Sequence, residues 1–180
     1  MVYILLGNGF EETEAIAPLD LLRRAQIPTM TVGLNGKAIT GGHGICVNTD
    51  ITIDEMDLTD LDMIVLPGGL GGVDSIKKCD AAMDAIGFAW ENGKFVAAIC
   101  AAPTILASLH ITDGKNAVCY PGCEENMGSA IMHNNVPCIR DENLITGASA
   151  GCAVPFGLML IAALKGSDVA KAVREQIVIR

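Results

Sequence analysis

The segment Phe95–Leu106 decides the fold and reads FVAAICAAPTIL. Its first five residues form a continuous apolar run, which is typical of a buried parallel strand. The run continues past Cys100 into a predicted helix that begins at Ala101. A sharp turn from a strand into a helix presents one side chain above the sheet, and Cys100 holds that position.

Cys100 has two interpretations. The N–H groups at a helix start are unpaired and carry the positive end of the helix dipole, which lowers a thiol pKa from its reference value of about 8.5. That interpretation predicts a reactive nucleophile. Cysteines in apolar runs are also often small buried hydrophobic residues, and this second interpretation predicts no chemistry.

Two other loops are expected beside Cys100. The acidic segment Glu11–Glu14 follows the first predicted strand, and the turn Pro67–Gly69 follows the strand Asp62–Leu66. Because the carboxyl ends of parallel strands meet at one edge of a sheet, all three loops are expected at the edge where ligands bind in open α/β folds.

The backbone at these loops can bind an oxyanion. The N–H groups of Gly69 and Ala101 are predicted to form an oxyanion pocket beside Cys100, since glycine lets a backbone approach a bound oxygen closely. An ordinary turn between a strand and a helix is the alternative. The glycine-rich turn lacks the lysine and hydroxyl residue of a phosphate-binding loop, so no nucleotide cofactor is expected.

Glu14 is the predicted acidic partner of the thiol. It shares a helical face with Leu21 and Leu22, so it is the one glutamate of the segment expected to point inward. A buried carboxylic acid that donates a hydrogen bond to a thiolate holds the anion and sets its reactivity. The neighbouring acids are explained by the dipole at a helix start.

Tyr120 and His133 are weaker candidates for the pocket. Tyr120 follows the predicted strand Asn116–Cys119, so its hydroxyl is expected to line the pocket or to pack in a turn. His133 lies in an irregular segment from which it can approach a cleft.

Composition favours one domain over residues 1–180. The chain is 51% hydrophobic and 18% charged, which suits an α/β protein whose sheet is covered on both faces. We expect a three-layer α/β/α sandwich with a mostly parallel sheet. The mean hydropathy of +0.42 favours a homo-oligomer, since no apolar run is long enough for a membrane span.

Charge and cysteine content limit the partners. The net charge of −9 argues against nucleic acid and anionic membranes, which leaves small molecules or other proteins. Seven cysteines without a Cys-x-x-Cys pair indicate reduced thiols and no metal site. The N-terminus resembles a first strand rather than a signal peptide, so a cytoplasmic location is expected.

Strands and helices alternate along the whole chain. The predicted strands are 2–6, 29–34, an edge pair within 45–53, 62–66, 95–99, 116–119, and a hairpin of 136–140 with 143–146 turned at Asp141-Glu142. The predicted helices are 12–25, 81–91, 101–110 and 153–164, the last of these being the final long helix.

Four segments together resemble the ThiJ/PfpI superfamily, in the branch of the parkinsonism-associated protein deglycase and its bacterial chaperone-like relatives. They are Gly9–Ala15 (GFEETEA), Pro18–Ala25 (PLDLLRRA), Val65–Gly69 (VLPGG) and Ala97–Pro103 (AAICAAP). The resemblance covers essentially the whole chain.

The resemblance implies a flavodoxin-like sandwich, a homodimer and an oxidation-sensitive nucleophilic cysteine at Cys100. The protonated glutamate of the family falls on Glu14, and its oxyanion amides fall on Gly69 and Ala101. Members are credited with glyoxalase or deglycase chemistry on dicarbonyls and their protein adducts, with chaperone activity and with protection against oxidative stress. The related peptidases carry histidine directly after the cysteine, so Ala101 argues against peptidase activity.

The segment Gly147–Cys152 departs from the family pattern. It reads GASAGC and lacks the pocket arginine or glutamine that the branch carries there. The family's pocket histidine has no counterpart, since His133 falls a few positions away. Cys152 brings a second thiol to this loop, either as a resolving thiol that traps oxidised Cys100 as a disulfide or as a small side chain at the start of the last helix.

Two functions therefore follow from the sequence. In one, the Cys100 thiolate attacks a small dicarbonyl without any cofactor. In the other, the protein is a redox sensor or stress chaperone in which Cys100 is oxidised without turnover.

Overall fold

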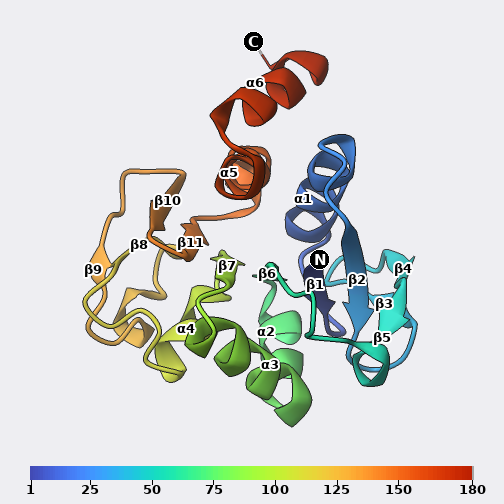
Figure 1. The fold of residues 1–180 in the computed structure, drawn as a ribbon. Helices are drawn as coiled ribbons and strands as arrows, with labels where there is room; N and C mark the ends of the chain where they lie inside the picture. Colours follow the sequence, from blue (N-terminus) through green and yellow to red (C-terminus); the bar gives the residue numbers. More distant parts are fainter. Residues whose placement is uncertain (180) are drawn as a thin grey trace.

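A seven-stranded sheet forms the centre of the protein in the computed structural model, which describes residues 1–179 (Figure 1). Every pairing in this sheet is parallel except the one between β10 and β11, which is antiparallel. The prediction of a mostly parallel α/β fold is confirmed.

The strands of the central sheet lie in the spatial order β10 (Cys138–Asp141), β11 (Leu144–Gly147), β7 (Phe95–Ile99), β6 (Met63–Leu66), β1 (Val2–Leu6), β2 (Thr29–Gly33) and β5 (Ile51–Thr52). Two short pairs stand apart from it, β3 (Ala38–Thr40) with β4 (Cys46–Asn48), and β8 (Asn116–Ala117) with β9 (Ile131–Met132).

Helices connect these strands. They are α1 (Glu12–Arg24), α2 (Leu70–Lys77), α3 (Asp80–Glu91), α4 (Pro103–Ser108), α5 (Ala153–Lys165) and α6 (Ser167–Gln176), with 3₁₀ turns η1 (Ile53–Glu55), η2 (Glu124–Asn126) and η3 (Ala150–Cys152).

Both faces of the sheet are buried. Along β1, Ile4 and Leu6 join an apolar cluster with residues of α1, α5 and α6, whereas Tyr3 and Leu5 join a second cluster with residues of α2, α3 and α4. Successive strand side chains point to opposite faces, so this alternation places helices on both sides (Figure 1). The expected three layers are present. None of the helices within residues 1–179 has the length and apolar content to cross a membrane.

Two helices are absent from the sequence prediction. Gly71 and Gly72 lie in α2 although glycine disfavours helices. A Cβ atom at Gly72 would lie 2.7 Å from Phe10 Cα, so the close approach of α2 to the first loop requires a residue without a side chain. Helix α6 is mostly polar and buries only Val173, so few apolar residues mark it in the sequence.

Two predicted elements are shorter than expected. Helix α4 starts at Pro103 rather than Ala101, because Ala101 and Ala102 form a turn. Strand β8 ends at Ala117 and pairs with β9 outside the central sheet, so Tyr120 does not follow a strand of that sheet. The predicted hairpin is confirmed, with Glu142 in a left-handed conformation (φ +55°) at its turn.

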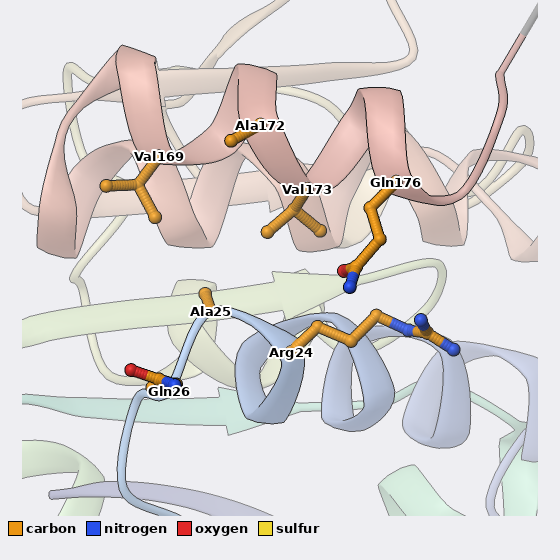
Figure 2. Close-up of a pocket in the computed structure, with 7 residues that line it drawn as sticks. All are labelled: Arg24, Ala25, Gln26, Val169, Ala172, Val173 and Gln176. Carbon is orange, nitrogen blue, oxygen red and sulfur yellow. The ribbon is translucent and has the colours of Figure 1, made fainter.

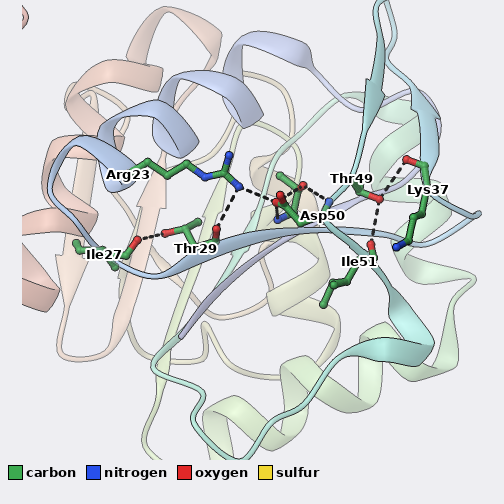
Figure 3. Close-up of polar contacts among 8 residues, drawn as sticks. Arg23, Ile27, Thr29, Lys37, Thr49, Asp50 and Ile51 are labelled. Carbon is green, nitrogen blue, oxygen red and sulfur yellow. Dashed lines mark hydrogen bonds and ion pairs between the residues drawn. The ribbon is translucent and has the colours of Figure 1, made fainter.

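A hydrogen-bonded carboxylate fixes the far edge of the sheet (Figure 3). Asp50 Oδ2 accepts hydrogen bonds from the Thr31 N–H and hydroxyl, each 2.8 Å long, and from Arg23 Nη2 at 2.7 Å. Partial removal from water raises the pKa of Asp50, but these bonds outweigh it and hold the pKa below its usual value. Helix α1, strand β2 and the residue before β5 are thereby joined.

Candidate active site

Cys100 occupies the sharp turn that the sequence predicts after β7. Its φ is +66°, in the left-handed region that costs a non-glycine residue on the order of 1–3 kcal/mol. Its N–H donates to the Gly147 carbonyl at 2.9 Å, and its carbonyl accepts from the Tyr120 N–H at 2.8 Å. Two flanking segments therefore hold the strained backbone in place.

Gly68 brings the acid and the thiol together. A Cβ atom at Gly68 would lie 2.6 Å from Cys100 Cβ, 3.1 Å from Cys100 Sγ and 2.6 Å from Glu14 Oε2. Such distances are shorter than van der Waals contact, so the site requires glycine here. This role of Gly68 is missing from the sequence prediction, although the adjacent glycines of Pro67–Gly69 are the signal that marks it.

Glu14 is fully buried, as predicted. Its Oε2 accepts a hydrogen bond of 2.8 Å from the Gly68 N–H. Its Oε1 accepts no hydrogen bond of normal geometry within residues 1–179. Burial raises the pKa of the carboxyl to about 7, against the opposing hydrogen bonds from Gly68 and Cys100. Glu14 therefore gains or loses its proton near neutral pH.

The pKa of the Cys100 thiol is raised, which corrects the expectation from the helix start. Burial is the largest cause and the charge of Glu14 the next, and together they raise the pKa to about 12. The amides of Ala101 and Gly69 act in the opposite direction but contribute less. Removal from water and a nearby carboxylate outweigh the helix dipole.

Glu14 and Cys100 titrate as a pair. Because each charge disfavours the other, the site loses one proton near pH 7 and holds the second to about pH 12. The single negative charge lies either on Glu14 or, when Glu14 holds the proton, on Cys100. The second arrangement is a thiolate that accepts a hydrogen bond from a carboxylic acid.

Two backbone amides face the sulfur. Hydrogen bonds from the N–H groups of Gly69 and Ala101 lower the pKa of Cys100 relative to burial alone. Gly69 has a φ of +82°, and a Cβ there would lie 2.5 Å from the Gly9 carbonyl oxygen. The structure thus brings both predicted oxyanion amides to Cys100.

Glu12 points away from the thiol. Its carboxylate accepts hydrogen bonds from the His43 N–H at 2.8 Å and pairs with His43 Nδ1 at 2.9 Å. Burial alone raises the pKa of Glu12, but these bonds and one from Ile45 outweigh it and lower the pKa to about 2. Glu11, Glu12 and His43 come within 4.8 Å of one another, but the positive end of α1 disfavours a cation there.

The structure places the remaining candidates differently. The Tyr120 side chain is exposed, and its backbone N–H donates to the Cys100 carbonyl. His133 Nε2 lies 2.7 Å from Asn116 Oδ1, in a network that continues to Asp141. This network gives the His133 ring a structural partner, and its approach to the thiol stays a prediction. Cys152 is the N-cap of α5, and its sulfur lies 3.8 Å from the Ser149 hydroxyl.

A groove separate from Cys100 lies between the end of α1 and α6 (Figure 2). It has a volume of about 380 Å³ and is lined by Arg24, Ala25, Gln26, Val169, Ala172, Val173 and Gln176. None of these lining residues is a nucleophile, so no covalent chemistry is expected in this groove.

The same segments that form the site are those of a known family. Residues 1–163 match the model of the DJ-1/PfpI family. The chain belongs to this family. As a DJ-1/PfpI protein it shares 31% of its residues with protein dj-1beta of Drosophila melanogaster, over 98% of this chain and 95% of that protein.

Further relatives agree with this assignment. A deglycase of Pyrococcus abyssi is 32% identical over 87% of this chain and 92% of its own length. The crystal structure of a DJ-1 superfamily protein from Salmonella typhimurium, a mutant in which a cysteine is replaced by alanine, superposes with a TM-score of 0.93. It is 30% identical and covers 99% of this chain and 98% of that one.

Proposed function

We propose that this DJ-1/PfpI protein is a cysteine-dependent stress-protection enzyme that acts on small dicarbonyls or on their protein adducts. The observation that supports this most directly is the placement of Cys100 against a buried carboxyl with a pKa of about 7. Such a group gives and accepts protons at physiological pH. No cofactor takes part in the proposed reaction.

The first step forms a hemithioacetal. The Cys100 sulfur adds to the aldehyde carbon of a 2-oxoaldehyde, a carbon–sulfur bond forms, and the carbonyl electron pair moves to oxygen. The amides of Gly69 and Ala101 stabilise that oxyanion, and Glu14 gives it a proton. One such donor is worth roughly 2.7–4 kcal/mol in other enzymes.

The later steps return the thiol. The Glu14 carboxylate removes the hydrogen, as a proton, from the carbon bonded to sulfur and delivers it to the neighbouring carbonyl carbon. The hydroxyl proton of the first carbon passes to the oxygen of that neighbouring carbon, which gives a thioester of a 2-hydroxy acid. Water then attacks the thioester and gives a proton to the Glu14 carboxylate, the carbon–sulfur bond breaks, and the Cys100 thiolate leaves. The overall reaction consumes one water and needs no external oxidant.

A redox role for the same cysteine is the second candidate. The loop Gly147–Cys152 carries no charged side chain, so an anionic substrate finds no cation there, whereas the half-buried Cys100 remains open to a small peroxide. In this role Cys100 becomes a sulfenic or sulfinic acid without turnover.

Lactate formation from methylglyoxal tests the enzymatic proposal. Wild type and the matched control Cys46→Ser, which changes an exposed thiol, are expected to form lactate at equal rates. Cys100→Ser and Glu14→Gln are expected to lose at least about 100-fold. Equal rates in all four proteins would refute the proposal.

Mass spectrometry after mild peroxide tests the redox candidate. Oxygen should add to Cys100 before it adds to Cys46, Cys79 or Cys138. Uniform oxidation of all thiols would remove the basis for a special cysteine.

A further inference from the structure

Cys138 and Cys152 are two further thiols, and they lie near the junction of the edge strand β10 with the start of α5. Cys138 is the first residue of β10 and stands opposite Gly147 of β11 in the antiparallel register. The ladder continues one step further, since the Ala148 N–H donates to the Pro137 carbonyl at 3.0 Å. The chain then turns through η3 and reaches Cys152, four residues after Ala148.

Both cysteines lie on the same side of the sheet. Cys138 packs against the apolar cluster that contains Phe156 and Leu160 of α5. Cys152 is the N-cap of that helix. Cys138 on β10 and Cys152 at the start of α5 therefore lie near the same junction of sheet and helix.

Their charges also interact. The pKa of the Cys138 thiol is raised to about 11, mainly by burial and then by the thiolate of Cys152. Within residues 1–179, Cys152 is not one of the groups that shift the pKa of Cys100. Both Cys138 and Cys152 are free and half-buried, so a small oxidant can reach the pair.

We propose that Cys138 and Cys152 form a second redox site, independent of catalysis at Cys100, which closes into a disulfide when the protein meets a hydroperoxide. The proposal rests on the shared position of the two thiols between β10 and α5 and does not depend on the proposed dicarbonyl chemistry.

The reaction balances with hydrogen peroxide as the oxidant. The sulfur of Cys152, at the start of α5, attacks one peroxide oxygen, the O–O bond breaks, and water leaves once a proton is added. The resulting sulfenic acid is then attacked by the Cys138 sulfur. The S–S bond forms, the S–O bond breaks, and a second water leaves with the proton of Cys138.

Closure of this disulfide constrains the loop behind the nucleophile. The segment between the two cysteines contains Gly147, whose carbonyl accepts the Cys100 N–H at 2.9 Å. A covalent link from β10 to the start of α5 fixes that segment at both ends. The oxidised protein is accordingly expected to melt at a higher temperature than the reduced protein.

Peptide mapping of the full-length wild-type protein tests the proposal. Cleavage after glutamate separates Cys138 on 126–142, Cys152 on 143–175, and Cys100 with Cys119 and Cys123 on 92–124. After treatment with stoichiometric hydrogen peroxide, digestion without reductant is expected to give 126–142 linked to 143–175. The linked peptide should come from protein that runs as a single chain on a non-reducing gel and should disappear on reduction.

Two variants sharpen the result. Cys152→Ser is expected to abolish the linked peptide and the rise in melting temperature, whereas the control Cys79→Ser should preserve both. A link between 143–175 and 92–124, or free thiols on both Cys138 and Cys152 at a dose that has oxidised Cys100, would overturn the proposal. The linked peptide and both contrary results are read on the wild-type protein itself. A folding defect in a variant therefore does not obscure the test.

Discussion

The Glu14 carboxyl group and the Cys100 thiol face each other across the Cα atom of Gly68. A methyl group at Gly68 would lie 2.6 Å from both Glu14 Oε2 and Cys100 Cβ. The same Gly68 donates its N–H to Glu14 at 2.8 Å. One glycine therefore sets both the separation and the hydrogen bonding of the two groups that carry the proposed chemistry.

Replacement of Gly68 tests this arrangement. Gly68→Ala is expected to push Cys100 and Glu14 apart, because neither the cysteine backbone nor the buried carboxyl can move freely. We expect a loss of roughly 1–3 kcal/mol in the free energy of unfolding and a large fall in methylglyoxal turnover. Chemical denaturation and lactate assays measure the two effects.

Gly87→Ala is the matched control. Gly87 lies in α3, and a Cβ there meets nothing within 4 Å. That substitution should raise stability by roughly 0.5–1 kcal/mol, as Gly→Ala does within helices, and leave turnover unchanged. If Gly68→Ala behaved like Gly87→Ala, the contact between Glu14 and Cys100 would not depend on Gly68.

Glu14→Gln should change how stability depends on pH. The pKa of Glu14 is raised from 4.5 to about 7 in the folded protein, so the folded state binds more protons than the unfolded state between these values. The free energy of unfolding of wild type should therefore fall between pH 4.5 and 7, relative to the variant, by roughly 3 kcal/mol. Urea unfolding across this range measures the difference.

An exposed carboxyl provides the comparison for that experiment. Glu91→Gln, at the end of α3, should follow the wild-type curve throughout. Parallel curves for wild type and Glu14→Gln would mean that Glu14 has an ordinary pKa in the folded protein.

Glu12→Gln should show the opposite pH dependence. The pKa of Glu12 is lowered from 4.5 to about 2, so the carboxylate stabilises the folded state above pH 4.5, and this stabilisation is lost as the pH falls toward 2. Glu12→Gln should be less stable than wild type at about pH 6. As the pH falls toward 2, wild type should lose more of its free energy of unfolding than Glu12→Gln does. An unfolding series from about pH 6 down to about pH 2.5 that gave equal slopes would contradict this role.

The central sheet and the turn at Cys100 could be predicted because they depend on local patterns. Continuous apolar runs such as Phe95–Ile99 identify buried parallel strands, and the following loops must then share one edge. Glu14 is identified by the helical face that it shares with Leu21 and Leu22. The family resemblance agrees with the match over residues 1–163.

Other features depend on contacts between distant segments. Helix α2 contains Gly71 and Gly72, which local propensity excludes but which close packing against the first loop requires. The raised pKa of Cys100 arises from burial and from Glu14, and neither is visible in the segment around the thiol. The shared position of Cys138 and Cys152 depends on the register of a hairpin that only the structure shows.

The rate of alkylation of Cys100 as a function of pH tests the central claim most directly. Iodoacetamide reacts with the thiolate form of a cysteine. The labelling of Cys100 is read on peptide 92–124, and the labelling of exposed Cys46 on peptide 15–55 is the internal reference. We predict a first rise near pH 7 in wild type, when the pair loses one proton, and a second rise toward pH 12. Glu14→Gln should show a single rise at a pH below the second one of wild type. A single rise near the reference thiol pKa of about 8.5 in both proteins would contradict the pairing of Glu14 with Cys100.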